Sequence, residues 1–176
     1  MLHIVGHWTW PGHEGRSRQV KVYSHMDEVE LVLNGNSLGT KTQSAGAGLP
    51  NVPRVWDVTY AQGTLTAIAR GRGRELSDER KTASSPHHLL LESDVTEVRS
   101  GDRESVAYLT AIVVDEQGTV VPTATHPITF TTYGPGELLE QTWLGHGTGL
   151  TWNAVAGKTR VAFRATSRTG HAVVSA

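Results

Sequence analysis

Histidine is the residue type in this chain best suited to bind a metal ion. The sequence has nine histidines and no cysteine, and His3, His7 and His13 lie close together near its start. A zinc site needs three or four ligands that converge in a tetrahedron. These three lie beside tryptophan and glycine in an expected strand and loop, so we expect structural roles and no metal site. His87 and His88 are adjacent, and alternate strand residues point to opposite faces, so we do not expect them to chelate together.

The tryptophans are the candidates for contact with carbohydrate, because an aromatic ring offers a flat apolar face with a polar edge. Trp8 and Trp10 are two residues apart, which would place both on one face of a strand. The alternative is that Trp8 and Trp10 pack inside the protein or against a part of it that is absent from this chain. We favour this alternative. Trp143 and Trp152 lie in a glycine-rich stretch and are the better candidates for a carbohydrate surface.

The charged residues do not indicate a nucleic-acid or membrane partner. Lys and Arg number 16 against 17 Asp and Glu, so there is no strong basic excess. Arg70, Arg72 and Arg74 alternate with glycine, yet no aromatic residues are interleaved with them, and we interpret the segment as a solvated hairpin bend. No glycine-rich run lies between a strand and a helix, so we expect no phosphate-bearing cofactor and indeed no cofactor at all.

Alternation of polar and apolar residues predicts β-strands along the first half of the chain. Val20 and Val22 share one face, as do Val29, Leu31 and Leu33. Asn34-Gly35 suits a type I′ turn, because both residue types tolerate positive φ. A flexible stretch is expected at 44–48. The strands expected here are Arg18–Tyr23, Glu28–Leu33, Ser37–Thr42, Arg54–Thr59, Thr64–Arg70 and Arg74–Thr82.

The segment 83–86, Ala-Ser-Ser-Pro, indicates a linker, because small residues followed by proline interrupt strand pairing. Turns are expected at 115–118 and 167–170. The strands expected after the linker are His88–Glu92, Ser105–Val114, Ile128–Thr132, Thr159–Thr166 and Ala172–Ser175. Many short strands with turns between them favour an all-β fold of two tandem immunoglobulin-like antiparallel β-sandwiches, at residues 1–83 and 84–176. One larger sandwich is the alternative.

Residues 2–83 resemble the domain that follows the catalytic barrel in bacterial family 2 glycoside hydrolases. The resemblance is carried by four segments in the same order: HWTWPG, VYSHMDEVELVLNGNSLG, VWDVTYAQGTLTAIA and ERKTA. The second half is similar to bacterial, invasin-type immunoglobulin-like domains through LTAIVVDEQGTVVPTATHPITFTTYGPG at 109–136. Beyond Gly136, residues 142–153 depart from the Asn-Gly-Asp motif that we expect there, so no binding role is carried over.

The resemblance implies an accessory fragment without the active site. Family 2 enzymes use two barrel glutamates, and a barrel of about 250 residues does not fit here. We therefore expect no catalytic residues in this chain, no activity of the chain alone, and a β-galactosidase-like parent whose catalytic barrel is its partner. We expect that parent to be periplasmic or extracellular. A carbohydrate-binding module and an adhesin-like spacer are the alternative functions.

Overall fold

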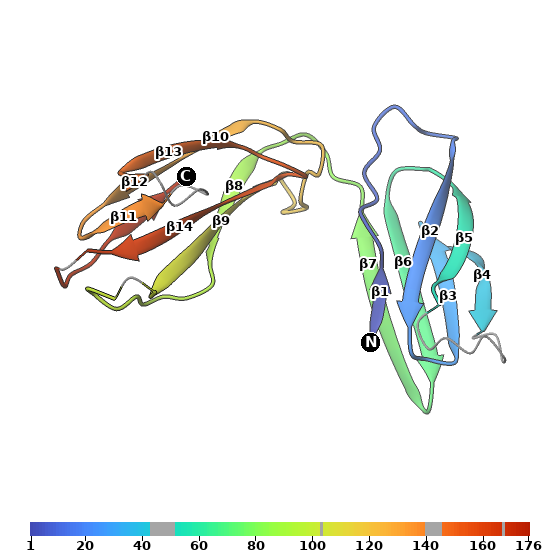
Figure 1. Cartoon of the computed structure of the whole chain (residues 1–176). Coiled ribbons are helices and arrows are strands. Elements are labelled where there is room, and N and C mark those ends of the chain that lie inside the picture. Colours follow the sequence, from blue (N-terminus) through green and yellow to red (C-terminus); the bar gives the residue numbers. More distant parts are fainter. Residues whose placement is uncertain (43–51, 103, 140–145, 167) are drawn as a thin grey trace. The chain divides into compact units, whose positions relative to one another are not determined.

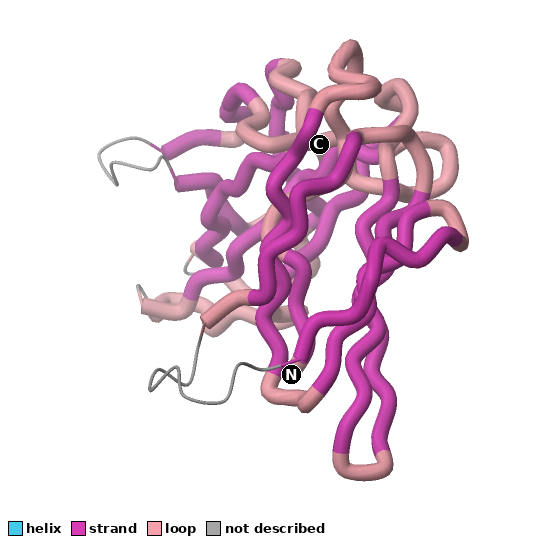
Figure 2. Tube along the Cα trace, turned by 90° about the vertical axis from the view of Figure 1, so that its right-hand side faces the viewer, coloured by secondary structure: helices cyan, strands magenta, loops and turns pink. Residues whose placement is uncertain are grey.

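The computed structural model describes residues 1–42, 52–102, 104–139, 146–166 and 168–176. All regular structure in these residues is β-strand, as Figure 2 shows, and so they contain no helix that could cross a bilayer. Every strand pairing is antiparallel, which confirms the all-β fold class. The chain divides into two compact units, Met1–Thr82 and Ala83–Ala176 (Figure 1).

The first unit is a sandwich of two antiparallel sheets. One sheet has the order β1-β2-β5 and the other the order β4-β3-β6-β7 (Figure 1). The strands are β1 (Leu2–Ile4), β2 (Ser17–Ser24), β3 (Glu28–Leu33), β4 (Asn36–Thr42), β5 (Arg54–Thr59), β6 (Thr64–Gly71) and β7 (Arg74–Lys81).

Local sequence determines much of this sandwich. Asn34 and Gly35 adopt φ values of 51° and 81°, as the type I′ turn between β3 and β4 requires. The alternating apolar residues of β2, β3, β5 and β6 form one buried cluster, which also contains Trp8 and Tyr60. The predicted faces of β2 and β3 are therefore confirmed. The predicted flexible stretch at 44–48 lies outside the described residues.

A pair of charged residues closes one edge of the first sandwich. Asp78 of β7 accepts a hydrogen bond from the Ile4 amide at 2.7 Å. Arg80 donates to the carbonyls of Ile4 (2.7 Å) and Gly6 (2.9 Å) and to the Asp78 carboxylate (2.8 Å). These contacts join β1 of one sheet to β7 of the other, where both are edge strands. Sequence reasoning gave no sign of this link.

The second unit is a sandwich of a five-stranded and a three-stranded sheet. Their orders are β12-β11-β14-β9-β8 and β13-β10-β15. The strands are β8 (His88–Ser93), β9 (Val106–Val114), β10 (Pro127–Tyr133), β11 (Gly136–Leu139), β12 (His146–Gly147), β13 (Gly149–Asn153), β14 (Lys158–Ala165) and β15 (Val173–Ser175).

The segment Gly134-Pro135-Gly136 carries the chain from β10 in one sheet to β11 in the other. Gly134 has a φ of 110°, which L side chains rarely adopt. At Gly136 a Cβ atom would collide with the ring of Phe163 on the neighbouring β14. Glycine at 136 therefore lets the Phe163 ring pack over the backbone of β11.

Asp115 organises the turn after β9. Its side chain is 2% exposed, and its carboxylate accepts hydrogen bonds from the amides of Ser84 (2.9 Å), Gln117 (3.0 Å) and Thr119 (2.8 Å). Burial raises the pKa of this carboxyl, but the three donated hydrogen bonds outweigh burial and leave the pKa below its usual value. The charged side chain thus fixes both the 115–118 turn and the preceding linker segment.

The eleven strands expected from alternation lie within a few residues of observed strands, but four short strands were missed. These are β1, β11, β12 and β13. Each is at most five residues long, so alternation has little length over which to show. Consequently Trp152, expected in a loop, lies in a strand.

Candidate functional site

Trp8 is part of the first sandwich core. Only 2% of it is exposed, and its indole Nε1 donates to the Ala61 carbonyl at 3.0 Å. The ring of Tyr60 meets it edge-on at 5.1 Å. The segment 7–10 is not a strand, so the expectation that Trp8 and Trp10 share a strand face is wrong. A sugar has no exposed face of Trp8 on which to stack.

Trp10 is half-buried and surrounded by polar partners from its own unit. The Arg18 guanidinium lies 4.2 Å from its ring centroid, and the His7 ring lies 4.4 Å away. A cation over an indole contributes about 0.5 to 2 kcal/mol. The Trp10 amide donates to the hydroxyl of Tyr60 at 3.1 Å, and Arg18 also contacts Nδ1 of His13 at 2.6 Å. Arg18 and His7 of the same unit therefore pack against the ring of this indole.

A cavity of about 250 Å³ lies next to this cluster, between β2 and the loop after β1. Burial is the main cause that lowers the pKa of His7, and the charge of Arg18 lowers it further. His7 is thus neutral at pH 7, and Arg18 supplies the positive charge. The Nε atom of Arg18 is buried and has no hydrogen-bond partner. The lining residues are Ile4, Val5, Gly6, His7, Trp8, Trp10, Arg18, Gln19, Val20 and Leu65.

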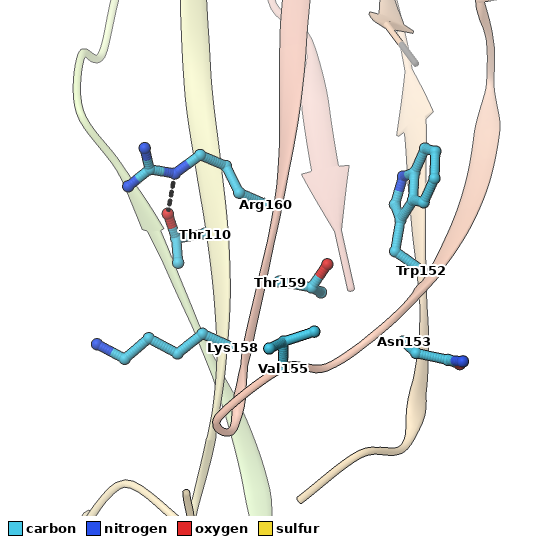
Figure 3. A pocket seen from close by; sticks show the side chains of 7 residues that line it. All are labelled: Thr110, Trp152, Asn153, Val155, Lys158, Thr159 and Arg160. Atoms are coloured by element: carbon cyan, nitrogen blue, oxygen red, sulfur yellow. Dashed lines mark hydrogen bonds between the residues drawn. The ribbon is translucent and has the colours of Figure 1, made fainter. Parts of the chain in front are cut away.

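A cavity of about 330 Å³ lies beside Trp152 in the second unit (Figure 3). Trp152 pairs with Ile128 of β10 and packs partly against the core, and its Nε1 is buried without a hydrogen-bond partner. Figure 3 shows Thr159 on the Trp152 side of β14, while Lys158 and Arg160 extend away on the other side. The indole and the two cations therefore do not converge on one ligand.

Trp143 lies outside the described residues, so the structure does not place this fourth candidate. Of the four tryptophans proposed from sequence, one is buried, one is packed against Arg18 and His7, and one lines a cavity through a half-buried ring. Trp8 and Trp10 belong to the first unit and Trp152 to the second.

The histidines and carboxylates take part in separate contacts. In the described part of the chain, no three of the His, Asp and Glu side chains gather as a metal site would require. Arg70 lies between Glu30 (3.0 Å) and Glu75 (2.8 Å) on the exposed face of the first unit. The Nδ1 atoms of His87 and His88 lie 3.1 Å apart, so the two rings do not point to opposite faces as alternate strand residues would. His87 precedes β8, so the strand rule does not apply to it.

Carboxylates are absent from the described cavities. Beyond the two above, a cavity of about 760 Å³ lies at one end of the second unit and is lined by Tyr133, Gly134, Pro135, Thr166, Arg168, Thr169, Gly170 and His171. No Asp or Glu lines any of these three cavities. The fold is thus that of two tandem antiparallel β-sandwiches whose described cavities lack the paired carboxyl groups of a glycosidase.

Comparison with known proteins identifies the family. Residues 89–176 match the glycoside hydrolase family 2 C-terminal domain 5, and residues 15–77 match a domain of unknown function, DUF4982. The chain belongs to the C-terminal accessory domains of bacterial family 2 glycoside hydrolases.

Individual relatives agree with this assignment. The chain is 34% identical over 138 residues to the beta-galactosidase BoGH2A of Bacteroides ovatus, covering 77% of the chain and 15% of that protein. It is 37% identical over 91 residues to a putative beta-glucuronidase of Formosa agariphila, covering 51% of the chain and 9% of that protein. It thus spans only a small part of the length of these relatives.

Solved structures share the fold over almost the whole chain. A beta-glycosidase from Bacteroides vulgatus superposes with a TM-score of 0.82 at 25% identity, over 98% of this chain and 22% of that one. A beta-glucuronidase from glycoside hydrolase family 2 superposes with a TM-score of 0.81 at 25% identity, over 99% of this chain and 18% of that one.

Proposed function

We propose that this chain is a non-catalytic accessory region of a longer family 2 glycoside hydrolase that cleaves an O-glycosidic bond in carbohydrate metabolism. The match of residues 89–176 to a C-terminal domain of that family carries the proposal. The similarity to a beta-galactosidase and a putative beta-glucuronidase supports a β-galactoside or a β-glucuronide as the substrate of the longer enzyme.

The distribution of carboxylates supports the non-catalytic role. A retaining glycosidase needs two carboxyl groups about 5 to 5.5 Å apart on either side of the scissile bond. No Asp or Glu lines the three described cavities, and Glu30 and Glu75 each form an ion pair with Arg70. Hydrogen bonds from Ser37 and then Arg70 lower the pKa of Glu30, so it is not suited to donate a proton at neutral pH.

Hydrolysis assays test this proposal directly. The chain and the longer polypeptide that contains it would each be given nitrophenyl β-galactoside and nitrophenyl β-glucuronide. Activity of the longer polypeptide alone is the expected result, and the preferred glycoside identifies the substrate. Turnover by this chain alone would overturn the non-catalytic role, whether or not a Glu30→Gln variant retained it.

A structural role follows from the same proposal, in which the two sandwiches pack beside the catalytic barrel of the longer enzyme and hold it in place. We place that enzyme in the periplasm or outside the cell, and cell fractionation with antibodies against this chain tests the location. The carbohydrate-binding alternative has less support, because Trp8 is buried and Trp10 is packed against Arg18 and His7.

A further inference from the structure

Strand β8 exposes three consecutive leucines at the edge of the second sandwich. Leu89, Leu90 and Leu91 are 38%, 41% and 38% exposed, and every residue of β8 is exposed. Edge strands usually carry charged residues or proline, which prevent pairing with other chains. A leucine-rich edge strand with this much exposed surface therefore indicates that something else covers it.

The register of β8 shows which way these side chains point. Leu89 lies opposite Val113 of β9 and Leu91 lies opposite Ala111, and both partners are in the buried core. Residues directly opposite in an antiparallel pair lie on the same face of the sheet. Leu89 and Leu91 thus lie on the inner face, which should be covered by the facing sheet. Leu90, opposite Ile112, lies on the outer face.

The inner face is left uncovered because the two sheets differ in width. One sheet has five strands, whereas the facing sheet has only β13, β10 and β15. A cavity lined by Trp152 of β13 and Thr159 of β14 places β13 beside β14. Strands of packed sheets run nearly aligned. The inner-face residues of β9 are buried, whereas those of β8 are exposed. The three-stranded sheet therefore extends from β13 over β9 toward its edge at β15, and β8 is the strand that lacks a cover.

Strand β15 offers the edge on which a cover could form. It pairs with β10 along Val173–Ser175, and its other edge has no partner strand among the described residues. Val173 is 65% exposed on this strand, while Val174 packs partly against the core. A strand that added to the free edge would extend the three-stranded sheet and lie over Leu89 and Leu91.

We propose that a further β-strand, supplied by the longer polypeptide of which this chain forms part, pairs with the free edge of β15 and covers Leu89 and Leu91. Its apolar residues would alternate, so that one face meets the two leucines and the other is solvated. The relatives supply the reason for this source, since the chain spans only 15% of the Bacteroides ovatus protein and 22% of the Bacteroides vulgatus protein. The proposed function is needed only to say that the strand comes from the longer enzyme; the docking site on β15 and β8 does not depend on it.

The test appends a probe strand to the full chain. After Ala176, an Asn-Gly turn leads into six residues of alternating threonine and valine. The matched control carries proline at two of these six positions and cannot donate the ladder hydrogen bonds. Hydrogen exchange is followed by mass spectrometry in peptides that contain β15 and β8. We expect the threonine-valine strand to slow exchange in β15 at least about tenfold and to raise the unfolding temperature of the second unit by about 5 °C.

Leucine variants decide whether the inner face is the docking surface. Leu89→Thr with Leu91→Thr should abolish most of the gain, whereas Leu90→Thr, on the same strand but the opposite face, should leave it. No slowing of exchange with the appended strand, or equal loss with Leu90→Thr, would overturn the proposal. A dimer in sedimentation that Leu89→Thr with Leu91→Thr dissociates would also overturn it, in favour of a second copy. The glycosidase assays are independent of all these outcomes.

Discussion

Replacing Asp115 with alanine should destabilise the second unit more than replacing any other described Asp or Glu of that unit. The side chain is 2% exposed and accepts three backbone hydrogen bonds, from Ser84, Gln117 and Thr119. Hydrogen bonds to a charged group contribute about 1.5 to 3 kcal/mol each, and they are not additive because water enters the vacated space. We therefore expect Asp115→Ala to lower the unfolding free energy of this unit by about 3 kcal/mol.

The size of this effect is a large share of the whole stability, which for a domain is about 5 to 15 kcal/mol. Asp115→Asn keeps one acceptor oxygen and the same volume, so we expect a loss of about half as much. Asp94→Ala is the matched control, because Asp94 is exposed and accepts a single amide hydrogen bond, from Tyr108 at 2.7 Å. Its loss should be below about 1 kcal/mol.

Hydrogen exchange at increasing urea concentrations measures these changes, because peptides from each unit report on that unit alone and a two-unit chain need not unfold in one step. Peptides from the first unit should be unchanged in all three variants. If Asp115→Ala and Asp94→Ala lowered stability equally, the reasoning that the buried carboxylate fixes the linker and the turn would be refuted.

Three further predictions concern the pH response, the Arg80 link and the close contact at Gly136. The folded pKa of Asp115 lies below its unfolded value near 3.9, so the contribution of this carboxylate to the unfolding free energy is complete above about pH 4 and is lost as pH falls through the folded value. In acid titrations, the difference in unfolding free energy between the parent chain and Asp115→Asn should therefore shrink over that range. A constant difference would contradict the pKa argument. Arg80→Ala removes the donors to the Ile4 and Gly6 carbonyls and to Asp78, so amide exchange in β1 should speed up about tenfold while exchange in β3 and β6 is unaffected. Unchanged exchange in β1 would disprove the link. Gly136→Ala should destabilise the second unit by about 1 to 3 kcal/mol in urea unfolding, because the new Cβ would meet the Phe163 ring. Adding Phe163→Leu to the same chain should recover part of this loss. No recovery would argue against steric conflict as the cause.

Local patterns in the sequence were sufficient for the longer strands of this protein. The alternation in β2 and β3 predicted which residues are buried, because a period of two fixes the side of the sheet on which each side chain lies. Asn34-Gly35 predicted the turn for a similarly local reason, since it depends only on the φ values that these residue types tolerate. The family resemblance, carried by several ordered segments, also came from the sequence alone.

The candidate carbohydrate contacts show where sequence patterns stop being informative. Spacing suggested that Trp8 and Trp10 form one aromatic platform, but the loop at 7–10 sends Trp8 into the core and leaves Trp10 against Arg18 and His7. Whether an aromatic face is open to a ligand depends on groups far away in the chain that cover it. Trp152 likewise joined a strand only because β10 provides its hydrogen-bond partners.

The sequence by itself determined the longer strands, the main turns and the family, because each depends on residue order within a short window. Only the tertiary structure decided the Asp78 and Arg80 link between sheets, the burial of the Asp115 carboxylate and the exposure of Leu89 and Leu91 on an inner face. Those features arise where segments distant in sequence meet or fail to meet. Such long-range contacts produce no periodic pattern in the local order of residues, so they cannot be predicted from it.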